Sequence, residues 1–253
     1  MSDFDRDRNE VIERALASGV NTIITVGTDL ESSRKAIEIS ETHPEVLATV
    51  GFHPHEASRV TENSLIDLAR LAAHPRVVAI GEIGLDFYRN RSPREIQLRV
   101  LKQQLGLSID VNLPVIIHCR RAESDMFPLL SEWALTSKSK RNRPPGVIHC
   151  FSGDIDTARR YLEMGFFISF GGYIGYPSSL NLHSVIKSIP PDRYVVETDC
   201  PFLPPQPYRG KRNEPAYVTL TVETIARIRQ ISPETVARET TRNALSLFKP
   251  ALR

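Results

Sequence analysis

The chain has 253 residues, of which 41% are hydrophobic, so it can form a sizeable core and we expect a single domain over residues 1–253. A net charge of +2 excludes attraction of a polyanion by overall charge alone, so a polyanionic partner would have to be bound by local patches. No apolar run reaches the roughly 18 residues of a membrane span, the segment Met1–Glu10 is charged, and the three cysteines predict no disulfide framework, so we expect a cytoplasmic protein with no membrane partner.

Short β-branched runs alternate with amphipathic stretches along the chain, which is typical of α/β proteins. In chain order the pattern predicts strands at Val20–Val26, Val46–Val50, Val77–Ile80, Pro114–Ile117, Val147–Ile148, Phe166–Phe170 and Tyr194–Glu197. A helix is predicted before the first strand, at Asp5–Ser18, and one after each of the first six strands, at Leu30–Thr42, Thr61–Ala73, Pro93–Asn112, Ala122–Thr136, Ile155–Met164 and Ser178–Ser188. Two helices, at Ala216–Gln230 and Pro233–Leu247, follow the last strand.

Seven strands, each followed by a helical pattern, come after an opening helix. This order predicts a TIM-type (β/α)₈ barrel whose first strand is missing. An open doubly wound sheet accommodates seven strands as well and is the alternative architecture. The placement of polar residues favours the barrel, because barrel enzymes carry their chemistry at the carboxyl ends of the strands.

Metal-binding residue types recur where the predicted strands end. They are His53, Glu82, His118, His149 and Asp199, each following a different strand. One histidine after a strand is most often a capping or packed residue, but the whole set predicts a common metal site. Imidazole and carboxylate ligands together suit Zn, Mn, Fe or Mg. Cys119, Cys150 and Cys200 directly follow such residues, and we interpret them as small buried side chains rather than ligands.

Basic and aromatic residues near the same strand ends are candidates for contacts with phosphate. Arg120 shares its strand face with His118, while Arg209, Lys211 and Arg212 lie in the loop after Asp199. Arg89 and Arg91 form a second candidate patch, and Tyr88 and Tyr173 are candidates for stacking on a base. The basic segment 138–143 precedes a strand, so we expect it at the opposite end of the barrel as solvated surface.

Six motifs resemble those of the TatD family of metal-dependent DNases, in the same order and over nearly the whole chain: GFHPH (51–55), GEIGLDFY (81–88), PVIIHCR (114–120), GVIHCFSG (146–153), ETDCPFLPP (197–205) and RGKRNEPAY (209–217). The resemblance implies a hydrolase that uses one or two divalent metal ions (Mg, Mn or Zn). It implies that Glu82 bridges the metals, that His118 and His149 bind one of them, and that Asp199 binds the other and handles the attacking water. His53 matches a position near the substrate phosphate or the metal.

The chain departs from the family at its front. Most members begin with a strand that ends in a His-x-His pair for the first metal, and this sequence starts after the corresponding position. Some members lack these histidines, so activity is still expected.

The resemblance implies hydrolysis of phosphodiester bonds in DNA, as a 3′–5′ exonuclease on single-stranded ends. We expect a monomeric protein. A metal at Glu82, His118 and His149 would polarise a phosphoryl oxygen and acidify a water, and Asp199 would orient that water or accept its proton. Arg120, Arg209, Arg212 and His53 are the predicted substrate-binding residues. The alternatives are a hydrolase of small esters or amides and a truncated, catalytically weak relative.

Overall fold

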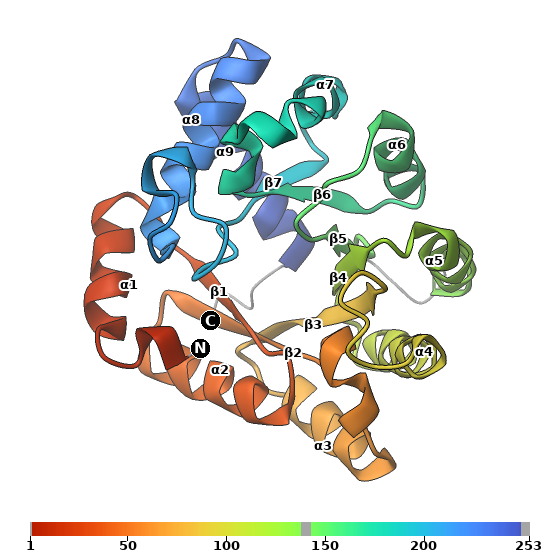
Figure 1. Cartoon of the computed structure of the whole chain (residues 1–253). Coiled ribbons are helices and arrows are strands. Elements are labelled where there is room, and N and C mark those ends of the chain that lie inside the picture. The colour runs from red at the N-terminus through yellow and green to blue at the C-terminus, as the bar shows by residue number, and fades with distance from the viewer. Residues whose placement is uncertain (1, 138–142, 249–253) are drawn as a thin grey trace. The chain divides into compact units, whose positions relative to one another are not determined.

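The structure, a computed structural model, describes residues 2–137 and 143–248. Within these ranges the helices and strands alternate as Figure 1 labels them. The strands are β1 (Ile23–Val26), β2 (Val46–Val50), β3 (Val77–Asp86), β4 (Val115–Arg120), β5 (Gly146–Ile148), β6 (Phe167–Phe170) and β7 (Tyr194–Val196). The α-helices are α1 (Arg8–Ala17), α2 (Leu30–Thr42), α3 (Glu62–Ala72), α4 (Arg94–Asp110), α5 (Glu123–Ser137), α6 (Ile155–Glu163), α7 (Asn181–Ser188), α8 (Val218–Arg229) and α9 (Pro233–Phe248).

The chain divides into two compact units. The His53 unit comprises the described parts of Thr22–His149, Glu163–Phe166 and Leu245–Arg253. The Asp199 unit comprises the described parts of Met1–Asn21, Cys150–Leu162 and Phe167–Ala244. The single domain expected from the sequence stays a prediction.

The His53 unit holds five parallel strands in chain order, β1 to β5. The pairing of β3 with β4 is irregular between Ile80 and Ile83 and then regular, with Gly84 opposite His118 and Asp86 opposite Arg120. Helices α2, α3, α4 and α5 pack against these strands. This pairing brings Glu82, in the middle of β3, close to His118 in the second half of β4.

Local sequence determines where the helices of this unit begin. Asp29 accepts a hydrogen bond from the backbone N–H of Ser32 (2.7 Å) and so caps α2, and Thr61 caps α3 through Ser64 in the same way. Ala36 and Ile37 on α2 are buried, as are all five residues of β2. The helices therefore cover strands that are themselves apolar throughout, as expected of parallel sheets.

In the Asp199 unit β6 pairs with β7 in parallel, with Ile168 opposite Tyr194. Short 3₁₀ helices surround this pair: η3 (Gly172–Gly175), η4 (Pro177–Ser179), η5 (Gln206–Tyr208) and η6 (Pro215–Tyr217). Helix α1 contacts η6, although about 200 residues separate them in the sequence. The first and the last thirds of the chain therefore meet within this unit.

The predicted elements are present, with shifted boundaries. The strand predicted at Val77–Ile80 continues to Asp86, because Ile83 and Leu85 stay fully buried while polar residues and glycine alternate with them. The opening helix begins at Arg8 instead of Asp5, after the 3₁₀ helix η1 (Ser2–Phe4). Most of the basic segment 138–143 lies outside the described residues. Among the described helices, none is long and apolar enough to cross a membrane.

Candidate metal centre

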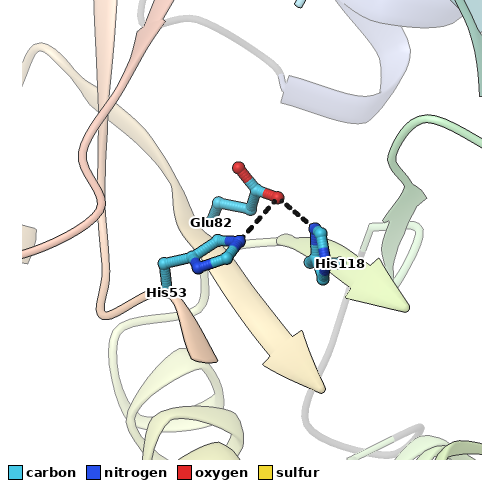
Figure 2. Close-up of side chains that lie close together, drawn as sticks. All are labelled: His53, Glu82 and His118. Atoms are coloured by element: carbon cyan, nitrogen blue, oxygen red, sulfur yellow. Dashed lines mark hydrogen bonds and ion pairs between the residues drawn. The ribbon is translucent and has the colours of Figure 1, made fainter. Parts of the chain in front are cut away.

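Three side chains of the His53 unit converge on one point (Figure 2). Glu82 lies in β3, His118 in β4, and His53 directly after β2. One carboxylate oxygen, Glu82 Oε1, lies 2.8 Å from His118 Nδ1 and 3.6 Å from His53 Nε2. Potential ligand atoms of the three residues all lie within 4.8 Å of one another. Two imidazoles and a carboxylate at this spacing fit a divalent transition metal.

His149, which follows β5, belongs to the same group. Its Nε2 lies 3.9 Å from Glu82 Oε1, and its backbone N–H donates to Ile117 O (2.9 Å). Its side chain is 14% exposed and that of Glu82 is 12% exposed, so the group is accessible at one side but mostly enclosed. The structure thus brings together Glu82, His118, His149 and His53, which the sequence predicted at four separate strand ends.

Asp86 lies at the end of β3 and supports one histidine of this group, His118, together with the neighbouring His55. Its Oδ2 accepts hydrogen bonds from His118 Nε2 (3.2 Å) and His55 Nε2 (2.9 Å). Its Oδ1 accepts from the backbone N–H groups of Tyr88 (3.0 Å) and Arg89 (2.7 Å). Histidine ligands of metals usually have such a carboxylate on the second ring nitrogen, where it fixes the orientation of the ring.

The electrostatics of the group hold the carboxylates charged. Burial raises the pKa of Glu82, but the charge of His149 and the hydrogen bond from His118 outweigh it and place the pKa well below its ordinary value. The pKa of Asp86 is lowered as well, because the hydrogen bonds from His118 and the Arg89 backbone outweigh burial. Both carboxylates are therefore anionic, Glu82 beside the histidines and Asp86 as the hydrogen-bond acceptor behind His118.

The two central histidines differ in charge. Burial lowers the pKa of His53 to about 3, so this ring is neutral, and its Nδ1 accepts from the backbone N–H of His55 (3.1 Å) while Nε2 faces Glu82. Burial also lowers the pKa of His118, but its hydrogen bonds to Asp86 and Glu82 outweigh burial and raise that pKa to about 9. A metal bound at His118 would displace this proton, as metal binding to imidazole commonly does.

Two glutamines of α4 hold the backbone beneath the group. Gln104 accepts from Phe52 N–H (2.7 Å) and donates to Phe52 O (3.1 Å), immediately before His53. Gln97 accepts from Asp86 N–H (2.8 Å) and donates to Ser92 O (2.7 Å). Both side chains are buried, and both lie on one face of α4 because seven residues correspond to about two helical turns. One helix face therefore holds both segments that carry His53 and Asp86.

Asp199 lies in the other unit, just after β7. Its backbone has a φ of 57°, a left-handed conformation that is uncommon for residues with a side chain. Its Oδ2 lies 3.9 Å from the Sγ of Cys150, and the backbone N–H of Cys150 donates to Glu197 Oε1 (2.7 Å). Its assignment as a metal ligand and catalytic group stays a prediction.

The predicted phosphate-binding residues have different surroundings. Arg120 is exposed at the end of β4, with its guanidinium 4.2 Å from the ring centre of Tyr88. Arg209 lies over the ring of Tyr176 (4.8 Å). Arg212 instead forms an ion pair with Asp7 (2.5 Å) and lies over the ring of Phe4 (4.7 Å). Arg212 is thus already engaged by the opening segment of the chain.

The model of the protein family described as "TatD related DNase" matches residues 1–249 of the chain. The chain belongs to this family. An "Uncharacterized metal-dependent hydrolase YabD" of Bacillus subtilis is 42% identical over 246 residues, covering 97% of this chain and 94% of the relative. A "3'-5' ssDNA/RNA exonuclease TatD" of Musicola paradisiaca is 37% identical over 254 residues, covering 98% and 94%.

A solved TatD homologue from Escherichia coli, YJJV, superimposes with a TM-score of 0.90 at 29% identity, over 97% of this chain and 93% of that chain. The chain is therefore a TatD-family metal-dependent hydrolase with an α/β fold of the TIM type, and the predictions of family and fold class are confirmed. The seven described strands are those that the sequence predicted, apart from their boundaries.

Proposed function

We propose that this TatD-family hydrolase cleaves phosphodiester bonds in DNA, as a 3′–5′ exonuclease acting on single-stranded ends. The observation that carries the proposal is the convergence of two imidazoles, from β4 and the residue group after β2, on one mostly enclosed carboxylate oxygen of β3. The exonuclease name of relatives at about 37% identity supports DNA as the substrate. The proposal includes the cytoplasmic location and monomeric state expected from the sequence.

Glu82, His118 and His149 would hold the metal, with Asp199 as a further ligand and His53 beside them. When bound, a divalent metal there supplies Lewis-acid polarisation of a phosphoryl oxygen and a more acidic water. Glu82 contributes its negative charge in a nearly enclosed environment, where it acts more strongly than in water. Asp86 fixes the ring plane of His118. Asp199 would orient the attacking water or accept its proton, a role that a positioned carboxylate performs well.

Arg120 and Tyr88 would receive the nucleic acid beside this group. Tyr88 is 47% exposed, and the guanidinium groups of Arg89 and Arg121 also lie within 5.5 Å of its ring centre. Arginines match phosphate oxygens, and an exposed aromatic ring offers a surface on which a base can stack. Arg209 would provide a second phosphate contact from the Asp199 unit, and Arg212 would do so only in exchange for its ion pair with Asp7.

The test is cleavage of an end-labelled single-stranded oligonucleotide with added Mg²⁺, Mn²⁺ or Zn²⁺ and with EDTA. The wild-type protein should cut from the 3′ end only with metal, whereas Glu82→Gln and Asp199→Asn should lose most turnover. Glu62→Gln, in the exposed first turn of α3, is the matched control and should cut normally. Absence of metal-dependent cutting by folded wild-type protein would refute the proposed substrate, and near-normal cutting by Asp199→Asn would refute the role of that residue.

A further inference from the structure

Asn213 is a fully buried polar residue that the proposed mechanism does not use. It lies in the loop before η6, between Arg212 and Glu214. Its Nδ2 donates two hydrogen bonds, to Thr198 O (2.6 Å) and Phe202 O (2.7 Å). Its Oδ1 accepts from the backbone N–H of Glu214 (2.9 Å). Every hydrogen-bonding atom of this side chain is therefore used, two of the bonds going to a single turn.

That turn is the one that carries Asp199. The carbonyls of Thr198 and Phe202 flank it, and the backbone N–H of Asn213 donates to Pro201 O (3.0 Å) within it. The turn also closes on itself, because Phe202 N–H donates to Asp199 O (2.9 Å). Asp199 itself has the left-handed φ of 57°. Left-handed backbone at a non-glycine residue persists only where surrounding contacts determine it, and Asn213 supplies three of those contacts.

Ion pairs to α1 and to Asp7, the residue before it, hold the loop on both sides of Asn213. Glu214 accepts from Arg14 at both carboxylate oxygens, from Nε at Oε1 (3.3 Å) and from Nη2 at Oε2 (2.7 Å). On the other side Arg212 donates to both carboxylate oxygens of Asp7 (2.8 and 2.5 Å). Fork-to-fork contacts of this kind fix orientation as well as distance. Because Asn213 lies between two such contacts, it has little freedom to leave the turn.

We propose that Asn213 is a positioning residue that holds the backbone turn on which the carboxylate of Asp199 is aimed for catalysis. The inference rests on the proposed function, since it requires that Asp199 acts in the reaction. Asn213→Asp keeps the shape of the side chain but replaces the donor of two hydrogen bonds by an oxygen that faces two carbonyls. The turn should then relax and Asp199 should move. A displacement of about 1 Å at a reacting group can reduce turnover by about 100-fold.

Asn243 provides a matched control within the same unit. It is buried like Asn213, and its Nδ2 also donates to two carbonyls, Pro191 O (2.9 Å) and Tyr194 O (2.8 Å), which lie before and at the start of β7. Asn243→Asp therefore makes the same chemical change away from the Asp199 turn. It should lower the melting temperature by an amount similar to Asn213→Asp and leave turnover within about threefold of wild type.

The experiment measures kcat and KM with the labelled oligonucleotide and, separately, the melting temperature of each protein. The proteins are wild type, Asn213→Asp, Asn243→Asp, Asp199→Asn and the double variant Asn213→Asp/Asp199→Asn. We expect Asn213→Asp to lower kcat by about 10- to 100-fold with KM within about threefold. The double variant should be no slower than Asp199→Asn alone, because residues that act as one unit are not additive. If Asn213→Asp does not fold, Asn213→Ala and Asn243→Ala give the same comparison.

Two outcomes overturn the inference. One is equal kcat for the Asn213 and Asn243 variants at equal loss of melting temperature, with Asp199→Asn inactive. The other is a further loss of rate in the double variant that multiplies the two single effects. Near-normal turnover of Asp199→Asn is a different result, because it refutes the proposed role of Asp199 itself.

Discussion

Replacing Gln104 by leucine tests whether α4 holds the segment that carries His53. The two side chains have similar volume, but leucine cannot pair with the N–H and C=O of Phe52, which Gln104 binds at 2.7 and 3.1 Å. Phe52 is 4% exposed, so water reaches neither group easily. A buried polar group left without a partner costs about 1–3 kcal/mol, and the two together therefore cost about 2–6 kcal/mol. That is a large part of the 5–15 kcal/mol by which domains are typically stable.

The assay is urea unfolding followed by circular dichroism, with the free energy of unfolding obtained at a shared m-value. Gln103→Leu is the control, because its neighbour Gln103 is an exposed residue of the same helix. We expect Gln104→Leu to lose at least about 2 kcal/mol relative to that control. A difference below about 0.5 kcal/mol, the usual effect of a surface substitution, would refute the argument.

Three further predictions concern the same two units. Gly84→Ala should destabilise the protein by about 1–3 kcal/mol in unfolding experiments. The φ of Gly84 is 152°, and an added Cβ would lie 1.9 Å from His118 O. Gly106→Ala is the control and should not destabilise the protein, because an added Cβ there would lie in open space. Asp86→Asn should weaken Zn²⁺ or Mn²⁺ binding by about 10- to 100-fold in chelator competition, since His118 loses its supporting carboxylate, and unchanged affinity would contradict that role. The hydrogen bond from Arg212 lowers the pKa of Asp7. The stabilisation by this ion pair is therefore complete above about pH 4 and is lost as the pH falls toward the lowered pKa. The melting temperature of Asp7→Asn should fall less steeply below about pH 4 than that of wild type, and parallel curves would contradict the prediction.

The sequence predicts the architecture and most of the histidine group because both follow from simple rules. Strands that are apolar throughout indicate a parallel sheet, and the carboxyl ends of its strands gather their polar residues at one edge. His118, His149 and Glu82 are predicted in this way. Asp86 lies in the motif GEIGLDFY, and its even spacing from Glu82 along one strand places both on the same face. That parity is the sequence signal that points to a role for Asp86.

Other parts of the arrangement could not be predicted from the sequence. Gln97 and Gln104 lie in a helix whose polar residues are ordinarily exposed, and only the packing of α4 against β3 shows that both point inward. Arg212 is separated by about 200 residues from Asp7, and no local rule pairs them. Asn213 is equally silent in the sequence, because its importance depends on a turn that lies 11 to 15 residues earlier in the chain.

The use of glutamine beneath the metal-binding group has a consequence for how that group responds to its surroundings. An amide neither gains nor loses a proton over the physiological range and attracts cations far less than a carboxylate. The supports at Phe52 and Asp86 therefore stay neutral while the ligands above them change charge, and they do not compete for the ion. The hydrogen bonds that hold these backbone segments therefore do not depend on the charge of the ligands or on whether metal is bound. Removing metal with a chelator and adding it back should leave α4 in place and should be fully reversible.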